Sequence, residues 1–170
     1  MKLIRILAVA ALSVLVFGPG LPADRAFGQD KGQDKGQARD VEYVNAASQV
    51  FVAAIMARDI DAMDKVWAHE PYATFIGPLS TTVVVGWEGV RKAWQMRFSQ
   101  FDRVTISVAE SHVQTNGKVA WATGMEKVQL LRKDGKTVDL DVFVTNVFED
   151  RDGRWLLVSH QATPVFKEPK

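Results

Sequence analysis

The spacing of apolar residues predicts three helices in the first part of the chain. Between residues 40 and 55 apolar side chains recur every three or four positions, which is the pattern of an amphipathic helix. A short second helix is expected to begin at Asp59, whose side chain can cap a helix N-terminus, and to end before Pro71. A third helix is expected over residues 87–101, where large apolar side chains follow at intervals of four.

Strand patterns precede and follow the third helix. Short strands are expected over residues 72–76 and 81–85. From residue 104 onwards, long alternating runs are separated by the turn-forming pairs Asn116-Gly117, Asp134-Gly135 and Asp152-Gly153. These runs predict four consecutive antiparallel strands, at roughly 104–115, 118–131, 136–149 and 154–163. Three helices and such a sheet predict an α+β fold, in which the sheet curls around the helices and leaves a conical cavity.

The first 28 residues have the pattern of a secretory signal peptide. A basic start precedes a run of 12 residues (6–17) that are apolar except for Ser13, a Gly-Pro-Gly break and the small residues Ala26 and Gly28. A helix of that length covers about 18 Å at roughly 1.5 Å per residue, whereas a membrane span needs about 20 residues. We therefore predict cleavage before Gln29, a periplasmic or secreted protein, and no stable membrane anchor after cleavage. An uncleaved anchor is the alternative.

Residues 29–39 are predicted to be a flexible linker. This part of the chain repeats the tetrapeptide Gly-Gln-Asp-Lys almost three times and contains no large apolar side chain. Burial therefore cannot offset the entropy lost on ordering it. The folded domain is expected over residues 40–166, followed by a short tail at 167–170, and a domain of that size can bury a core of its own.

Composition and charge exclude several classes of function. The 170 residues contain no cysteine, which excludes disulfides, thiolate zinc sites and cysteine nucleophiles. The formal net charge is +1, and removing residues 1–28 takes away three basic side chains and one acidic side chain and leaves −1. Such a balance argues against nucleic-acid binding. No phosphate-loop, dinucleotide or Gly-x-Ser-x-Gly motif is present, and His69-Glu70 lacks the second histidine of a zinc helix. We therefore predict no metal and no cofactor.

The pairing expected between the four long strands places candidate ligand-binding residues on one face of the sheet. Two-residue turns at the first two turn pairs would place Trp121 opposite His112 and Phe148. A three-residue turn at the last pair would bring Asn146 and His160 onto the same face as Trp121. Together with aromatic residues from the rest of the domain, the predicted ligand-binding residues are Trp67, Tyr72, Trp94, Phe98, Trp121, Thr123, Asn146 and His160.

Three residues are candidates for acid–base catalysis, namely His160, His112 and Glu110. A bulge near Glu110 would turn His112 to the other face, so His160 is the stronger candidate. Each residue also has a structural interpretation. The aromatic residues can be core, His160 can be a buried histidine bonded to a neighbour, and Asn146 can hold Thr123 or point outward.

The opposite face of the last two strands is predicted to carry an apolar patch. The same pairing places on it Phe143, Val147, Trp155 and Leu157. An exposed apolar patch of that kind usually marks an interface. We therefore predict a homodimer through the outer face of the sheet.

Several short motifs are similar to those of a known family. They read RDIDAM (58–63) followed by Trp67, FIGP (75–78), GWEGVR (86–91), VAW (119–121), TNVF (145–148) and DGRW (152–155) leading to His160. Over almost all of residues 40–166 the chain resembles the SnoaL-like (DUF4440-type) branch of the NTF2-like superfamily. The resemblance implies a cystatin-like α+β cone, with three N-terminal helices packed in a strongly curved, mainly antiparallel sheet, an internal pocket and a dimer.

One position departs from the chemistry of ketosteroid isomerase-like members of the superfamily. These members place a carboxylate base immediately before a proline, and Gly77 holds that position here. Isomerisation of that kind is therefore not expected. The sequence favours binding of a small apolar molecule in the cavity. The alternatives are a lyase, cyclase or hydrolase that uses His160 or His112 as acid or base, and a structural dimerisation module.

Overall fold

The computed structural model describes residues 31–166, with side chains from residue 35 onwards. The predicted signal peptide with its cleavage site, residues 29–30 of the linker and the tail at 167–170 lie outside the described residues. Export from the cell therefore stays a prediction. None of the helices in the described part of the chain is long and apolar enough to cross a membrane.

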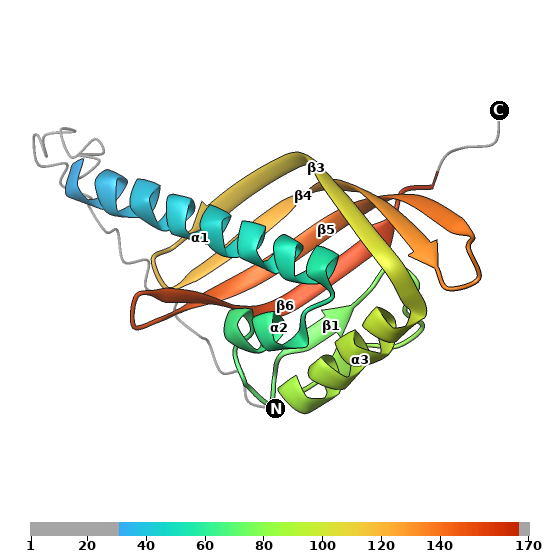
Figure 1. The fold of residues 1–170 in the computed structure, drawn as a ribbon. Helices are drawn as coiled ribbons and strands as arrows, with labels where there is room; N and C mark the ends of the chain where they lie inside the picture. The colour runs from blue at the N-terminus through green and yellow to red at the C-terminus, as the bar shows by residue number, and fades with distance from the viewer. Residues whose placement is uncertain (1–30, 167–170) are drawn as a thin grey trace, which may run out of the picture.

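Three helices cover the concave side of the sheet (Figure 1). They are α1 (Lys31–Ala57), α2 (Ile60–Val66) and α3 (Trp87–Gln100). The predicted start of α2 is confirmed, because the Asp59 carboxylate accepts hydrogen bonds from the backbone N–H groups of Asp61 and Ala62, at 2.9 and 3.0 Å.

α1 begins earlier than the sequence predicts and takes in residues 31–39. Lysine, glutamine and arginine have good helix propensity, so a helix that is anchored by burial further along can extend through them. Gln37 also ties this extension to the sheet, since its Nε2 donates a hydrogen bond to the carbonyl oxygen of Thr115 at 3.2 Å. The structure thus differs from the prediction of a flexible linker at residues 31–39, which are helical.

Six strands form one curved, mixed sheet (Figure 1). The two short strands are β1 (Thr74–Ile76) and β2 (Val84–Val85), and the four long strands are β3 (Phe101–Thr115), β4 (Val119–Arg132), β5 (Thr137–Arg151) and β6 (Arg154–Pro164). The strand order is β2-β1-β6-β5-β4-β3, and every neighbouring pair is antiparallel except β1 and β6, which are parallel. The predicted α+β architecture and its four consecutive antiparallel strands are confirmed.

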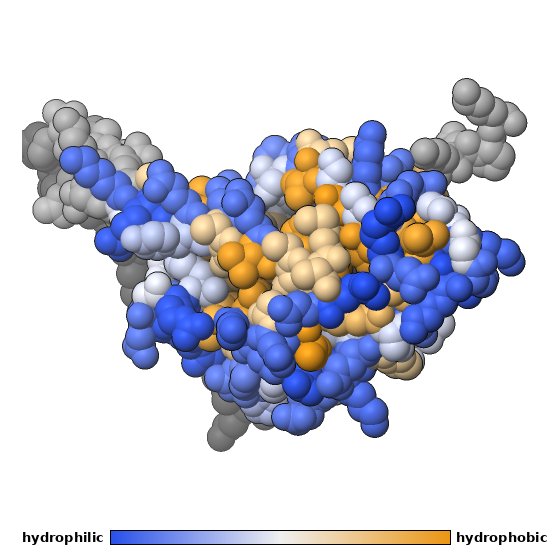
Figure 2. All heavy atoms as spheres, in the orientation of Figure 1, coloured by the Kyte–Doolittle hydropathy of each residue, from blue (hydrophilic) through white to orange (hydrophobic). Residues whose placement is uncertain are grey.

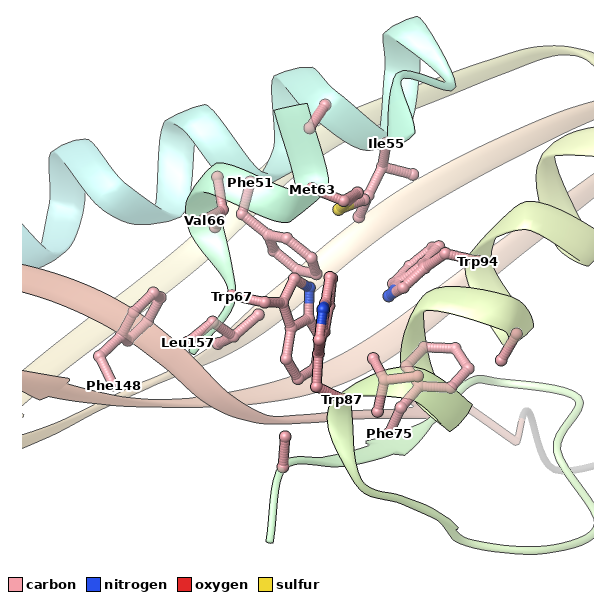
Figure 3. Packing of buried hydrophobic residues seen from close by; sticks show 14 of the residues in the cluster. Phe51, Ile55, Met63, Val66, Trp67, Phe75, Trp87, Trp94, Phe148 and Leu157 are labelled. Carbon is pink, nitrogen blue, oxygen red and sulfur yellow. The ribbon is translucent and has the colours of Figure 1, made fainter. Parts of the chain in front are cut away.

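The core is a cluster of aromatic and aliphatic side chains between the helices and the sheet (Figure 3). The Phe51 ring of α1 contacts the rings of Trp67 and Trp94, with centroids 6.1 and 5.8 Å apart. Phe148 and Leu157 cover the sheet on the same side and are fully buried. Since these side chains come from α1, α3, the end of α2 and the sheet, their burial holds the helices on the concave face.

The turn between β4 and β5 reverses the orientation predicted for β4. A three-residue turn at 133–135 replaces the predicted two-residue turn, and its last residue, Gly135, is in the left-handed region with φ 79°. Trp121 consequently pairs with Val147 instead of its predicted partner Phe148. Such a one-residue shift moves every side chain of a strand to the other face of the sheet. The inward positions of β4 are the even-numbered residues from Ala120 to Leu130, including Glu126.

The turn between β5 and β6 and a bulge in β6 change the predicted outer patch. The turn has two residues (152–153), and both have positive φ, 55° and 83°, as in a type I′ turn. Val158 is skipped in the pairing with β5, and such a bulge reverses which residues face inward. Trp155 and Leu157 precede the bulge and are only 7% and 0% exposed. The prediction that they share the outer face with Phe143 is therefore wrong.

The turn between β3 and β4 lies one residue later than predicted, at 117–118. This changes the pairing by two residues, so that Trp121 lies opposite Gln114 instead of His112. A shift of two residues keeps the facing of this part of β3 relative to β4, so it turns outward together with β4. A bulge at Ala109, which is skipped in the pairing with β4, confirms the irregularity expected near Glu110.

Candidate functional site

A cavity opens between α3 and the concave face of the sheet, beside the aromatic core; we call it the cone cavity. The side chains that border it are mostly apolar and include Ile55, Phe75, Trp94, Phe98, Leu130 and Val142. Three titratable side chains, those of Arg97, Glu126 and His160, border it as well. The volume of the cavity that is accessible to water is about 90 Å³, which is enough for several water molecules or one small organic molecule. Figure 2 shows apolar residues gathered on the surface between α1 and α3, on this side of the molecule.

His160 lies in the wall of the cone cavity and is held in a fixed orientation. Its Nδ1 lies 2.7 Å from Oδ1 of Asn146, directly opposite on β5. Because a carbonyl oxygen only accepts, Nδ1 carries the proton and Nε2 is left as a hydrogen-bond acceptor. The ring stacks on Phe75 with centroids 5.6 Å apart. Burial and, secondly, the charge of Arg97 lower the pKa of His160 from 6.5 to about 3, so the imidazole is neutral at physiological pH.

Arg97 of α3 brings a positive charge into the cone cavity. Its Nη2 donates a hydrogen bond to Oγ of Ser80 at 2.9 Å, and its Cζ lies 4.8 Å from the centroid of the Phe75 ring. Burial lowers the pKa of Arg97. No carboxylate within the described residues forms an ion pair with this guanidinium.

Gly77 leaves the space that the guanidinium occupies. A Cβ atom at position 77 would lie 2.7 Å from Nη2 of Arg97, which is too close for any side chain unless the arginine moved. The position at which ketosteroid isomerase-like proteins carry a base therefore borders a cation in this chain.

Glu126 of β4 is the third titratable group of the cone cavity. It is 7% exposed, and no hydrogen bond or ion pair joins its carboxyl group to another described residue. Burial raises the pKa of Glu126 from 4.5 to about 7, so both protonation states are populated at neutral pH.

Glu126 also borders a second cavity, which lies between α1 and the bulged part of β3; we call it the side cavity. Among the residues that line it are Ser48, Val52, Met56, Val108, Gly124 and Asn146. Gly124 is required where β3 and β4 approach each other at the bulge, because a Cβ atom at this position would lie 2.0 Å from the carbonyl oxygen of Glu110. The cone cavity and the side cavity thus share Glu126 as a common border.

The structure brings together some of the predicted site residues and separates others. Trp94, Phe98 and His160 border the cone cavity, and Asn146 lies behind His160 and borders the side cavity. Trp67 is packed in the aromatic core, where its ring also contacts Trp87. Thr123 alternates with the inward residues of β4 and touches only the side cavity.

The remaining candidates do not border the cone cavity, although Glu110 borders the side cavity. Trp121 is 42% exposed on the outer face of the sheet. Tyr72 is exposed, and its hydroxyl donates a hydrogen bond to Oε2 of Glu149 at 2.8 Å. Glu110 and His112 are exposed and bonded to each other at 2.7 Å, with the bulge turning them away as anticipated for His112. The prediction that Trp121 lines the cavity is therefore wrong, and the reason is the one-residue difference in the turn before β5.

Sequence reasoning missed Arg97 and Glu126, although the sequence contains a signal for each. Arg97 lies three residues after Trp94 and therefore on the same stripe of its helix. The alternating stretch Lys127-Val128-Gln129-Leu130 indicates that even-numbered residues of this strand point inward, and Glu126 belongs to that set.

Over residues 31–166, no three His, Asp or Glu side chains gather closely enough to hold a metal ion. The site that the described residues build is thus an apolar cavity with a guanidinium, a neutral imidazole and a carboxyl group of raised pKa.

A family model of the SnoaL-like domain matches residues 44–167. The chain belongs to this family. A comparison with curated proteins finds no match.

Several solved structures of NTF2-like proteins have the same fold as this chain. A proposed dehydratase of the NTF2-like family from Streptomyces avermitilis is 23% identical, with a TM-score of 0.70 over 76% of this chain and 99% of that chain. An NTF2-like superfamily protein from Salmonella enterica is 16% identical, with a TM-score of 0.67 over 80% and 95%. A proposed aromatic ring hydroxylase from Novosphingobium aromaticivorans is 17% identical, with a TM-score of 0.69 over 76% and 92%. At these identities the likeness establishes the cone fold alone.

Proposed function

We propose that this SnoaL-like domain binds a small, mainly apolar molecule that carries an anionic group, and that it does so in the cone cavity. The observation that carries the proposal is the guanidinium of Arg97, which borders an apolar cavity without a carboxylate partner. An apolar pocket with a few converging polar groups is the usual form of a small-molecule site.

The charge of Arg97 favours an anion as the polar part of the ligand. Arg97 is partly buried, and a cation withdrawn from water without a counterion costs free energy, part of which an anionic ligand would remove. The single hydrogen bond from Nη2 to Ser80 leaves other N–H donors of the guanidinium for a ligand. A planar carboxylate fits such donors in a two-bond arrangement.

The apolar side chains set the shape and polarity of the rest of the ligand. Phe75, Trp94 and Phe98 provide aromatic surface, and Leu130 and Val142 close the cavity from the sheet. These groups favour an aromatic or branched aliphatic body. The proposed dehydratase and the proposed aromatic ring hydroxylase among the similar folds are consistent with a cone cavity that takes small organic molecules.

The geometry gives less support to an enzyme that uses a histidine as its acid or base. His112 is exposed and bonded to Glu110. His160 borders the cone cavity, but with a pKa of about 3 it is a poor proton acceptor near neutral pH. In the proposed function the neutral His160 ring forms part of the cavity wall.

Two ligands of matched shape test the proposal, namely phenylacetate and the uncharged phenylacetamide. Their affinities would be measured by NMR titration at about pH 6, below the pKa of Glu126 of about 7, so that this carboxyl group is mostly neutral. We expect the native protein to prefer the carboxylate by about tenfold or more, since a hydrogen bond to a charged group contributes about 1.5–3 kcal/mol.

The Arg97→Gln variant should lose this preference and still bind phenylacetamide. Arg103→Gln provides the matched control, because Arg103 is exposed on β3 and borders neither cavity. Equal affinities of the native protein for the two ligands would contradict the proposal, and so would an unchanged preference in Arg97→Gln.

A further inference from the structure

The side cavity is the larger of the two cavities that Glu126 borders. The volume accessible to water is about 340 Å³ in the side cavity and about 90 Å³ in the cone cavity. Met56, Val108 and Ser111 line the side cavity and are exposed, so a molecule can enter it from the solvent. Val52 and Met56 of α1 and Val108 of β3 give it apolar surface. The side cavity can therefore hold a small organic molecule of its own.

Glu126 has no structural role that explains its burial. It is 7% exposed, and no hydrogen bond or ion pair joins its carboxyl group to another described residue. A buried carboxylate without a partner lowers the stability of a fold. Buried titratable groups beside a cavity are typical of functional sites, where a ligand can supply the missing partner.

The charged groups around the side cavity favour a cation as that partner. The titratable residues among the described ones that line it are Glu126 of β4 and Glu110 of β3. Glu110 is exposed and bonded to His112, so Glu126 is the carboxyl group that lacks a partner. The segments of α1 and β5 that line the side cavity contribute uncharged side chains, among them Asn45, Gln49 and Val144.

The cone cavity, on the other side of Glu126, has the opposite preference. It is bordered by the guanidinium of Arg97 and by His160, which is neutral at physiological pH. Arg97 repels a cation from the cone cavity, whereas the two glutamates repel an anion from the side cavity. The two cavities thus favour molecules of opposite charge.

We propose that the side cavity is a second binding site, which takes a small organic amine in its protonated form. The ammonium group pairs with the carboxylate of Glu126, and the apolar part of the amine lies against Val52, Met56 and Val108. Since the side cavity is open to water, the ammonium group keeps part of its hydration. This reduces the desolvation cost that makes fully buried ion pairs unfavourable.

Two ligands of matched shape test this proposal, namely benzylamine and the uncharged benzyl alcohol. NMR titration at about pH 8, above the pKa of Glu126 of about 7, measures the affinity of each. We expect the native protein to prefer benzylamine by about tenfold or more, because a hydrogen bond between charged groups is stronger than one between neutral groups. The chemical-shift changes should affect Val52, Met56 and Val108 and should not affect Phe98 and Leu130 of the cone cavity.

The Glu126→Gln variant should lose the preference for benzylamine and still bind benzyl alcohol. Glu110→Gln is the matched control, since Glu110 lines the same cavity but is exposed, and it should weaken benzylamine binding by about threefold or less. Circular dichroism shows whether Glu126→Gln folds. Val108→Lys leaves the buried glutamate in place and puts a positive charge at an exposed border of the side cavity, so it should also weaken the binding of benzylamine.

The affinity for benzylamine should depend on pH in the native protein. Burial raises the pKa of Glu126 to about 7, and the carboxylate is the form that pairs with an ammonium group. The affinity should therefore rise by about tenfold from pH 6 to pH 8, a range in which benzylamine stays protonated. Glu126→Gln should lack this rise. The pair formed by Glu110 and His112 is present in both proteins, so its contribution cancels when they are compared.

Three results would overturn the second site. They are equal affinities of the native protein for the two ligands, a preference for benzylamine that persists in Glu126→Gln or Val108→Lys, and chemical-shift changes confined to the cone cavity. The proposed function is tested separately, because the preference for phenylacetate depends on Arg97 and not on Glu126. Failure of either test therefore leaves the other proposal standing.

Discussion

The concave face of the sheet is built in two ways. In the first region the ring of Trp67 packs against the ring of Phe51 and lies in the same core cluster as Leu157. All three side chains are at most 1% exposed. Around Arg97 and Glu126, further along the same face, the side chains leave a cavity and include titratable groups that form no ion pair with a described residue. The border between these two regions is the pair formed by His160 and Asn146.

The difference indicates a division between stability and binding. Close-packed apolar side chains contribute free energy of folding through burial and dispersion contacts. Buried titratable groups without partners reduce it. The close packing around Trp67 stabilises the domain. This stability can offset the cost of the unpaired titratable groups around Arg97.

The largest effect should come from removing a ring in the packed region. Trp67→Ala should lower the free energy of unfolding by about 3–5 kcal/mol, because it leaves a cavity between helices and sheet. Phe98→Ala, at the half-buried border of the cone cavity, should cost about 1–2 kcal/mol. Urea denaturation of both variants measures the difference. Trp67→Phe serves as the milder control, since Nε1 of Trp67 has no hydrogen-bond partner to lose. Equal losses at the two positions would refute the division between the regions.

A second effect, of about 3 kcal/mol, should appear when the unfolding of the native protein and of Glu126→Gln is compared across pH. The pKa of Glu126 is raised from 4.5 to about 7 in the folded state, so the folded state holds a proton that the unfolded state releases. The contribution of Glu126 to stability is therefore fully present below pH 4.5 and is lost as the pH rises through about 7. Relative to the native protein, Glu126→Gln should gain about 3 kcal/mol between these pH values, at roughly 1.4 kcal/mol per pKa unit.

His160 should show the opposite pH dependence. Its pKa is lowered from 6.5 to about 3, so its contribution is present above pH 6.5 and is lost as the pH falls towards 3. This contribution is common to the native protein and Glu126→Gln and cancels when their stabilities are subtracted. A difference between the two proteins that does not change with pH would show that Glu126 titrates as it does in water.

The smallest effect on domain stability should come from the outer face of the sheet, which belongs to neither region. Phe143 is 56% exposed there, and Trp121 and Val147 lie beside each other on the same face. We propose that this corrected patch holds the homodimer together. Phe143→Glu should then give a monomer in light scattering while it changes the unfolding free energy of the isolated domain by about 0.5 kcal/mol or less. Thr137→Glu, an exposed position on the same strand, is the control. A native protein that is monomeric at tens of micromolar would contradict the dimer.

The sequence by itself determines the elements of this protein and their order. Local signals are sufficient for this, because a period of three to four residues, an aspartate cap and a turn pair each act within a few residues. The cap at Asp59, the four long strands and the shared helix face of Trp94 and Phe98 follow from such signals. The inward facing of His160 does not, because the bulge at Val158 offsets the wrongly predicted length of the turn before β6. The family resemblance also follows from motifs that are local.

The tertiary structure decides which side of each strand faces the helices. The turn before β5 has three residues instead of two, and the turn before β6 has two residues instead of three. Each difference concerns a single residue, but because side chains alternate along a strand it exchanges the inner and outer faces. This exchange moves Trp121 outward and Glu126 inward, and it buries Trp155 and Leu157. The facing of the strand residues of the candidate site is therefore fixed by turn and bulge geometry, which packing across the whole sheet selects.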